Sequence, residues 1–294
     1  MTTPTILVTG ASGHLGRLVV EALLDRGAAP EHIVATARDV DAIKGLADRG
    51  VTVRRADYAD PASLAAAFEG VDKALLVSSN AVGGDRVGQH TAVIEAAKAA
   101  GVGLLGYTSI PFADTTTMIL AQDHLATERV LAASGVPTVL LRNGWYHENY
   151  TENAAPALEH GVVLGSAGDG RVSAAARRDY AEAAAAVLLA EDDQAGKVYE
   201  LGGDEAFTLA EFARLLGEAA GKPIAYRDLP EEEYAAVLAG AGVPAPFAAV
   251  LADSSAGVGR GELEVTTGDL GRLIGRPTTP LADAVRGAVF AVSG

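Results

Sequence analysis

A glycine-rich segment near the N-terminus constrains the fold more than any other feature of this chain. It follows an apolar run at residues 5–9 and precedes a stretch, 15–26, whose apolar residues recur at helical spacing. Between a first strand and a first helix, such glycines allow a tight turn, close approach of a pyrophosphate and close helix packing. The helix N-terminus then offers free N–H groups to phosphate oxygens. The predicted dinucleotide-binding loop consists of Gly10, Ala11, Ser12, Gly13, His14, Leu15 and Gly16.

The first half of the chain alternates short apolar runs with amphipathic stretches up to about residue 142. This alternation predicts a parallel sheet with helices on both faces, which is an α/β fold of the doubly wound Rossmann type. The pattern changes after about residue 145, where helical stretches dominate. We therefore expect an NAD(P)-binding Rossmann domain over residues 1–145. A smaller C-terminal α/β lobe over residues 146–294 should pack against it, with a cleft between them.

Composition excludes several classes of function. The chain has no cysteine, so it has no disulfide, thiolate metal site or thiol nucleophile, and we predict no metal site. Its formal net charge of −15 disfavours contact with nucleic acid. No stretch approaches the roughly 20 apolar residues that span a bilayer, and no signal-peptide pattern is present. We expect a cytoplasmic protein without a membrane partner, and the sequence leaves open whether it forms a homo-oligomer.

The residues after the second predicted strand bear on which dinucleotide is bound. An NAD site usually places Asp or Glu there, on the ribose hydroxyls, whereas this chain has Arg38 followed by Asp39. A guanidinium can pair with a 2′-phosphate through its fork of donors, so Arg38 favours NADP(H). Two alternatives stay open: Arg38 is a solvated loop residue, or Asp39 neutralises it or itself faces the ribose.

Polar residues also follow the third and fourth predicted strands. Asp57 with Tyr58 follows the third strand and is a predicted adenine contact. Ser78, Ser79 and Asn80 end the fourth strand and are predicted to lie along the ribose and pyrophosphate. For both groups the alternative is a polar turn at a strand end.

The Tyr-x-x-x-Lys pair of standard short-chain dehydrogenases is missing. With Glu128 as the alignment anchor, Leu120 stands at the Tyr position and His124 at the Lys position. In that pair the Tyr donates a proton, while the Lys lowers the pKa of the Tyr and holds the ribose. The absence of the pair argues against ordinary ketone reduction, because the alkoxide product must be protonated as it forms.

Several segments form one pattern beyond the glycine loop. They are Tyr107-Thr108-Ser109, His124 with Glu128, Leu-Arg-Asn-Gly-Trp-Tyr at 141–146 and Ala-Gly-Asp-Gly at 167–170. Over nearly its whole length the chain resembles the NmrA-like atypical short-chain dehydrogenases, and within them the bacterial type 2 NAD(P)H:quinone oxidoreductases. In that family the segment around residue 145 closes over the nicotinamide end. The resemblance therefore implies that the cofactor is also contacted by Asn143, Gly144, Trp145, Tyr146, His147 and Glu148.

The missing acid agrees with reduction of a quinone. Hydride transfer to a quinone yields a phenolate-type anion, and a phenol has a pKa of about 10, whereas an alkoxide is nearer the roughly 15.7 of water. The quinone product therefore needs less help from a general acid. A flat apolar ring can stack on aromatic side chains. Those near the predicted cleft are Tyr107, Phe112, Trp145, Tyr146 and Tyr150.

Three of the polar and aromatic residues are candidate catalytic groups: His124, Tyr107 and Tyr146. His124 could hold the ribose, supply a proton or be a structural polar residue. Tyr107 could face either the core or the cleft, and Trp145 could instead anchor the core of the second lobe. Asp179 is interpreted as the N-cap of the helix that begins near residue 180.

Together these features predict an enzyme, an NADPH-dependent quinone reductase that transfers hydride directly to a quinone without flavin or metal. Two alternatives remain. One is a non-catalytic redox sensor that binds NADP(H) and acts through a partner protein. The other is a reductase of another electron-poor small molecule.

Overall fold

The computed structural model describes residues 3–81 and 84–293. Their arrangement in space divides the chain into two compact units. Unit 1 comprises Met1–Ile110, Asp123–Arg142 and Tyr180–Tyr199, and unit 2 comprises Pro111–Gln122, Asn143–Asp179 and Glu200–Gly294. Each unit draws on separate stretches of the chain. The division into 1–145 and 146–294 that we expect from the sequence stays a prediction.

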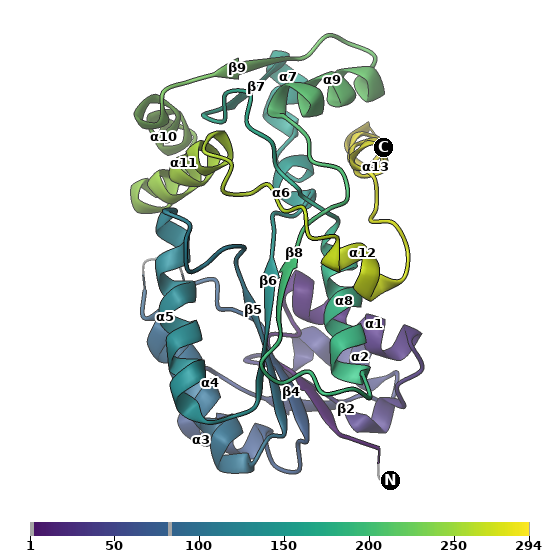
Figure 1. Cartoon of the computed structure of the whole chain (residues 1–294). Helices are drawn as coiled ribbons and strands as arrows, with labels where there is room; N and C mark the ends of the chain where they lie inside the picture. The colour runs from purple at the N-terminus through teal and green to yellow at the C-terminus, as the bar shows by residue number, and fades with distance from the viewer. Residues whose placement is uncertain (1–2, 82–83, 294) are drawn as a thin grey trace. The chain divides into compact units, whose positions relative to one another are not determined.

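A seven-stranded sheet carries most of unit 1 (Figure 1), in the order β3-β2-β1-β4-β5-β6-β8. The five strand pairs from β3 to β6 are parallel. The chain moves outward from β1 in one direction to β3 and in the other to β6, so β1 and β4 flank the topological switch point. This arrangement confirms the predicted α/β Rossmann fold. The strands are β1 (Ile6–Val8), β2 (Ile33–Ala37), β3 (Thr52–Arg55), β4 (Lys73–Leu76), β5 (Leu104–Ser109), β6 (Thr138–Asn143) and β8 (Val198–Leu201).

Helices cover both faces of this sheet, with α3, α4 and α5 on one face and α1, α2 and α8 on the other (Figure 1). Local sequence sets their ends. Asp60 caps α3 by accepting from the Ser63 N–H, and Asp85 caps α4 by accepting from the Gly88 N–H. The helices are α1 (His14–Asp25), α2 (Lys44–Ala47), α3 (Pro61–Ala67), α4 (Arg86–Ala100), α5 (Ile119–Ser134) and α8 (Arg177–Leu189).

The core of unit 1 lies between the sheet and helices α3 and α4. Leu7 and Leu76 from neighbouring strands are buried there with Phe68 and Ile94. Tyr107 of β5 belongs to the same cluster. Burial of this apolar surface provides the main stabilisation of the unit.

Unit 2 contains a two-stranded parallel sheet and several helices (Figure 1). Helix α9 begins with a capping box, in which the side chains of Thr208 and Glu211 each accept from the other's backbone N–H. The elements are β7 (Val162–Gly165), β9 (Ala225–Asp228), α6 (Glu148–Thr151), α7 (Ala155–His160), α9 (Leu209–Ala220), α10 (Glu231–Gly240), α11 (Ala245–Gly259), α12 (Asp269–Ile274) and α13 (Leu281–Ser293).

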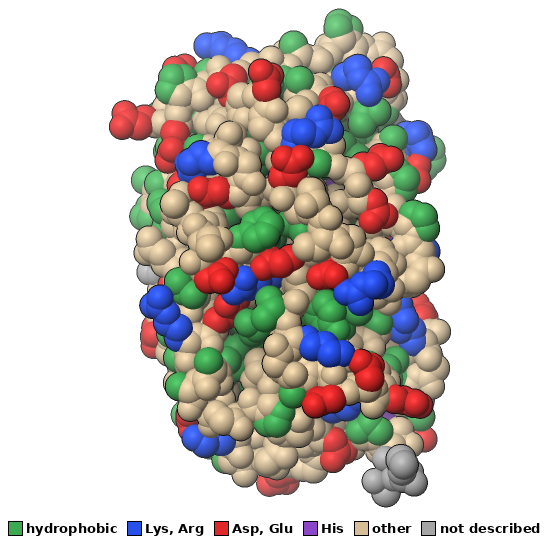
Figure 2. All heavy atoms as spheres, in the orientation of Figure 1, with side chains coloured by type: hydrophobic (Ala, Val, Ile, Leu, Met, Phe, Trp, Pro, Cys, Tyr) green, Lys and Arg blue, Asp and Glu red, His purple; other side chains and the backbone are tan. Residues whose placement is uncertain are grey.

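Charged side chains of both signs are interspersed over the face shown in Figure 2. The net charge of −15 is therefore not gathered into one patch on that face. Within residues 3–81 and 84–293, no helix is both long enough and apolar enough to cross a bilayer.

Candidate active site

The glycine loop joins β1 to α1 and leaves the helix N-terminus open. Gly10 has a φ of 63°, a left-handed conformation that favours glycine, and its carbonyl accepts from the Gly13 N–H at 2.9 Å. Gly13 is the N-cap of α1, and no side chain of the described residues caps the helix there. Ser12, Gly13 and His14 are exposed. The first turn of α1 is thus available to an anion.

Close backbone packing explains the last glycine of the loop. A Cβ on Gly16 would lie 2.7 Å from the carbonyl carbon of Gly10 and 3.0 Å from the Thr9 oxygen. A Cβ on Gly13 would lie 3.3 Å from the Gly10 oxygen, toward the exposed side of the loop. Gly16 is needed for the fold, whereas Gly13 keeps the surface of the loop clear.

A hydrogen-bonded cluster of Thr9, Tyr58 and Val77 stabilises the start of the glycine loop. The Tyr58 hydroxyl lies 2.6 Å from Thr9 Oγ1 and 2.8 Å from the Val77 carbonyl oxygen. Thr9 Oγ1 also accepts from the Val77 N–H at 2.9 Å. Tyr58, for which we predict an adenine contact, therefore has its hydroxyl engaged between β1 and β4. Sequence reasoning missed Thr9, which ends a buried strand and carries no periodic signal.

Arg38 follows β2 directly and is exposed. Within the described part of the chain its guanidinium makes no hydrogen bond or ion pair. The Asp39 carboxylate accepts from the Asp41 N–H at 3.0 Å, within its own turn. The alternative in which Asp39 neutralises Arg38 therefore finds no support in these contacts, and Arg38 is free to meet a phosphate.

The predicted contacts after β3 and β4 lie at the carboxyl ends of their strands. Asp57 Oδ1 accepts from the Ala59 N–H at 3.0 Å, which is the contact of a polar turn. Ser78 donates its N–H to Thr108 Oγ1 at 2.8 Å. Asn80 is exposed. These positions suit a ligand at the sheet edge, and the roles of Asp57, Ser78, Ser79 and Asn80 in binding it stay predictions.

Helix α4 holds Ser79 on three sides. The Ser79 N–H donates to His90 Nε2 at 2.8 Å, and its carbonyl accepts from Arg86 Nε at 2.7 Å. Its hydroxyl donates to Gln89 Oε1 at 2.6 Å. Three residues of one helix therefore fix the strand-end loop after β4.

His124 and Tyr107 belong to a buried network that also contains Arg86. Arg86 Nη2 lies 3.1 Å from His124 Nε2, and His124 Nδ1 lies 2.9 Å from the Tyr107 hydroxyl oxygen. A guanidinium can only donate, so Nε2 accepts and Nδ1 carries the proton that His124 donates to Tyr107. Both ring nitrogens of His124 are therefore occupied within the protein.

Burial keeps this network neutral apart from Arg86. It lowers the pKa of His124 well below its usual value, with the Arg86 charge adding to the effect, and it raises the pKa of Tyr107. Tyr107 is 0% exposed. Of the two alternatives for Tyr107, the structure supports the core, and neither Tyr107 nor His124 is placed as a ready proton donor to a substrate.

Sequence reasoning missed Arg86, although a signal was present. Arg86 is the first residue of α4, where the helix dipole disfavours a cation. A basic residue in an unfavourable helix position indicates another partner for its charge.

A buried ion pair also stands where β5 and β6 end. Arg142 Nε and Nη2 donate to the two carboxylate oxygens of Glu128 at 3.0 and 2.7 Å. The Ser109 hydroxyl donates to Glu128 Oε1 at 2.5 Å. Glu128, the alignment anchor in the sequence, thus fixes the residue that precedes Asn143.

The segment from Asn143 to Glu148 lies in unit 2 and combines buried and half-buried residues. The Asn143 carboxamide is buried and makes no hydrogen bond of good geometry with the described residues. The Arg177 guanidinium lies 5.2 Å from the centre of the Tyr146 ring. Burial raises the pKa of Tyr146, although Asn143 and Arg177 act in the opposite direction. Trp145 is half-buried.

The other end of this segment is structural. His147 is 2% exposed, packs against the Phe207 ring, and has a pKa that burial lowers to about 4. Both oxygens of the Glu148 carboxylate accept from the Arg177 N–H, at 3.1 and 3.0 Å, where α8 begins. Whether Asn143, Gly144, Trp145, Tyr146, His147 and Glu148 contact a cofactor stays a prediction.

The interpretation of Asp179 as a helix cap is wrong. Asp179 lies inside α8, and its carboxylate is 0% exposed. It accepts from Arg276 Nη2 at 2.7 Å and from the Thr279 N–H at 2.8 Å. The residue ties the C-terminal segment to α8, a long-range partnership that local sequence does not reveal.

Phe112 has a strained backbone. Its φ is 52°, and no other described residue except glycine has a positive φ. The Phe112 N–H donates to the Glu200 carboxylate at 3.0 Å, and its carbonyl accepts from Thr115 and Thr116. Such strain persists only where surrounding contacts enforce it, and it is often found at functional sites.

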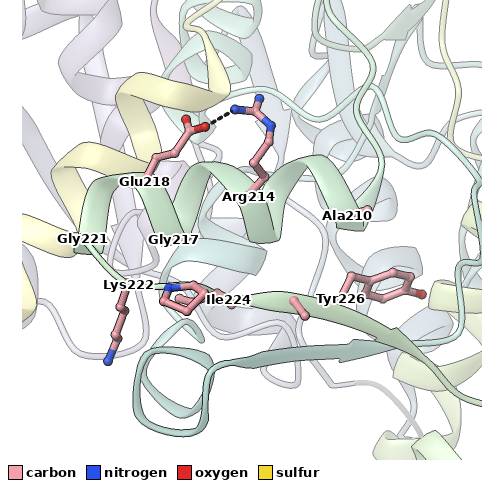
Figure 3. A pocket seen from close by; sticks show the side chains of 10 residues that line it. Ala210, Arg214, Gly217, Glu218, Gly221, Lys222, Ile224 and Tyr226 are labelled. Carbon is pink, nitrogen blue, oxygen red and sulfur yellow. Dashed lines mark hydrogen bonds and ion pairs between the residues drawn. The ribbon is translucent and has the colours of Figure 1, made fainter.

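A surface depression of about 570 Å³ lies between α9 and β9 in unit 2 (Figure 3). Its wall includes Arg214, ion-paired with Glu218, together with Lys222 and Tyr226. No residue of the predicted site lines it. In the part of the chain that the structure describes, no three His, Asp or Glu side chains are grouped to hold a metal ion.

Comparison with known proteins places these features in a family. The NmrA-like family model matches residues 2–266. Quinone oxidoreductase 2 of Escherichia coli is 49% identical over 280 residues, covering 95% of this chain and 97% of that protein.

Solved structures agree. A crystal structure of the E. coli NADPH-dependent quinone oxidoreductase complexed with NADPH has a TM-score of 0.92 and 48% identity, covering 96% of this chain and 99% of the other. Triphenylmethane reductase of Citrobacter sp., complexed with NADP(H), has a TM-score of 0.90 and 38% identity, covering 96% and 99%. The expected resemblance is confirmed, and this chain belongs to the NmrA-like family.

Proposed function

We propose that this chain is an NADPH-dependent quinone reductase that transfers hydride directly to a quinone without flavin or metal. The observation that best supports this type of reaction is the hydrogen bonding of His124. At the lysine position of the missing Tyr-x-x-x-Lys pair, it uses both ring nitrogens inside the protein. A site without that pair suits an acceptor whose reduced form is a weakly basic phenolate.

The residues of unit 1 fit NADPH. The open N-terminus of α1 and the clear surface at Gly13 suit the pyrophosphate, and exposed Arg38 suits the 2′-phosphate. The strand-end loop after β4, fixed through Ser79, suits the nicotinamide half. The relative complexed with NADPH supports the same assignment.

Reduced nicotinamide supplies the hydride when bound. The overall reaction consumes one quinone, one NADPH and one proton and yields hydroquinone and NADP⁺. The chain contributes position and exclusion of water, because effective hydride transfer needs donor and acceptor in close contact. Phe112, Trp145 and Tyr146 are the proposed aromatic contacts of the quinone.

A related reaction is a second candidate. Two relatives are named for other acceptors: triphenylmethane reductase, and the NAD(P)H azoreductase of Xenophilus azovorans, which is 31% identical over 244 residues. Both favour a reductase whose acceptor range extends beyond quinones. A non-catalytic redox sensor would bind NADPH without turning it over. A cytoplasmic location stays a prediction.

One assay separates these functions. The absorbance of NADPH is followed at fixed protein concentration with and without benzoquinone, after the protein is checked for bound flavin. Loss of absorbance that needs both protein and benzoquinone supports the proposal. Binding of NADPH with no turnover of benzoquinone would favour the sensor, and turnover of a triphenylmethane or azo dye alone would favour the second candidate.

A further inference from the structure

Arg86 carries a buried positive charge with an unused donor. Its side chain is 5% exposed. Nε donates to the Ser79 carbonyl and Nη2 to His124, whereas Nη1 is buried without a hydrogen-bond partner among residues 3–81 and 84–293. In the described part of the chain, Arg86 makes no ion pair with a carboxylate.

This arrangement is costly for a residue with only a structural role. A buried charge without a carboxylate partner and a buried donor without an acceptor both destabilise the folded chain. Burial lowers the pKa of Arg86, with opposing contributions from Tyr107 and Asp123. A ligand oxygen at Nη1 would relieve the cost of the unused donor.

The tautomers of the network show which group remains available. The Ser79 N–H donates to His90 Nε2, so His90 Nδ1 carries the proton that it donates to Thr127 Oγ1. His124 is likewise fixed by Arg86 and Tyr107. Neither imidazole has a free nitrogen, whereas Arg86 Nη1 is a charged donor of the cluster that no described residue engages.

Strand order indicates which half of a dinucleotide this cluster would meet. Arg38 follows β2 on one side of the switch point, and Ser79 follows β4 on the other. A dinucleotide lies across that point. If Arg38 binds the adenosine half, Ser79 and the adjacent Arg86 are on the nicotinamide side.

We infer that Arg86, rather than His124, provides the cationic contact to the ribose next to the nicotinamide, donating from Nη1 to a ribose hydroxyl oxygen. Arg86, which lies on α4, thus holds the ribose in place of the lysine that standard short-chain dehydrogenases carry at the position of His124 on α5. The inference rests on the proposed binding of NADPH.

The test compares NADPH with adenosine 2′,5′-bisphosphate, which lacks the nicotinamide ribose. Dissociation constants of both ligands are measured by calorimetry for the wild-type chain, Arg86→Met and Arg38→Ala. Loss of a charge-assisted hydrogen bond weakens binding by about 10- to 100-fold. We expect that loss for NADPH alone in Arg86→Met, and for both ligands in Arg38→Ala.

The outcomes are distinguishable. If Arg86→Met binds both ligands equally more weakly, or binds both as tightly as wild type, the inference is overturned. The proposed function is not affected by that result, because it rests on NADPH-dependent activity of the wild type. A wild-type chain that binds no NADPH overturns the proposed function as well. Arg86→Lys keeps the charge and decides the case if Arg86→Met does not fold. It should weaken NADPH by about 3- to 10-fold and leave the bisphosphate unchanged, and equal loss of both would again overturn the inference.

Discussion

Gly16 of α1 lies against the Gly10 backbone so closely that a Cβ on Gly16 would stand 2.7 Å from the Gly10 carbonyl carbon. Backbone cannot give way as a flexible side chain can. We expect Gly16→Ala to destabilise the fold by about 1–3 kcal/mol, the usual cost of overpacking, as measured by urea unfolding. Gly45→Ala is the control, because a Cβ there meets nothing within 4 Å. Equal stability of Gly16→Ala and wild type would contradict this packing.

Gly13→Val separates binding from folding. Its Cβ approaches only the Gly10 oxygen, at 3.3 Å, and Gly13 has an ordinary φ of −82°. The variant should unfold at nearly the same urea concentration as wild type and fail to bind NADPH, because the side chain would occupy the place of the pyrophosphate. Unchanged NADPH affinity in a calorimetric titration would remove the loop from the site.

Arg38→Ala tests the choice of dinucleotide. The exposed guanidinium has no partner among the residues that the structure describes, so a 2′-phosphate would gain a charge-assisted contact worth on the order of 1.5–3 kcal/mol. The wild type should prefer NADPH over NADH, and Arg38→Ala should lose most of that preference. If the ratio of the NADH and NADPH dissociation constants is the same in both proteins, Arg38 does not contact the 2′-phosphate.

The ion pair between Glu128 and Arg142 should contribute more to the free energy of unfolding than an exposed ion pair would. Its side chains are 8% and 9% exposed. Glu128→Ala removes the carboxylate that accepts from the buried Arg142 guanidinium and should cost about 3–5 kcal/mol in urea unfolding. The double variant Glu128→Met with Arg142→Met should recover much of that loss. Glu128→Met and Arg142→Met are measured singly as well, and a double-variant loss equal to the sum of their losses would show that the two side chains are not coupled.

Stability should fall in mild acid because of buried histidines. Burial lowers the pKa of His90 to about 3 and of His147 to about 4. The unfolded chain takes up protons as pH falls through about 6.5, whereas these folded side chains stay neutral, so unfolding is favoured between about pH 6.5 and 4. Each can contribute up to about 1.4 kcal/mol per pH unit. Urea unfolding at pH 7 and pH 5 should show a smaller difference for His147→Gln than for wild type, and an equal difference would contradict a neutral buried His147.

Local signals in the sequence are sufficient for features whose residues lie close together in the chain. The glycine loop, the Asp60 cap and the capping box at Thr208 depend on residues within a few positions of one another, so spacing alone predicts them. Arg38 was predictable for the same reason, because it follows a strand at a fixed distance from the loop.

Partnerships between distant residues were beyond such signals. Asp179 looked like a cap in the sequence, but its carboxylate binds Arg276 and Thr279 about a hundred positions away. Arg86 and His124 meet only because α4 and α5 flank the same strand ends. The alternation of apolar residues carries no information on which buried polar groups will meet, so these contacts required the fold.

Direct hydride transfer from NADPH to a quinone is tested most directly by steady-state kinetics. Initial rates are measured with flavin-free protein over a range of benzoquinone concentrations at several fixed NADPH concentrations. Direct transfer requires both substrates to be bound together, so reciprocal plots should give lines that intersect. Parallel lines would show that the protein passes the electrons through a carrier and releases NADP⁺ before the quinone binds, which would contradict the account.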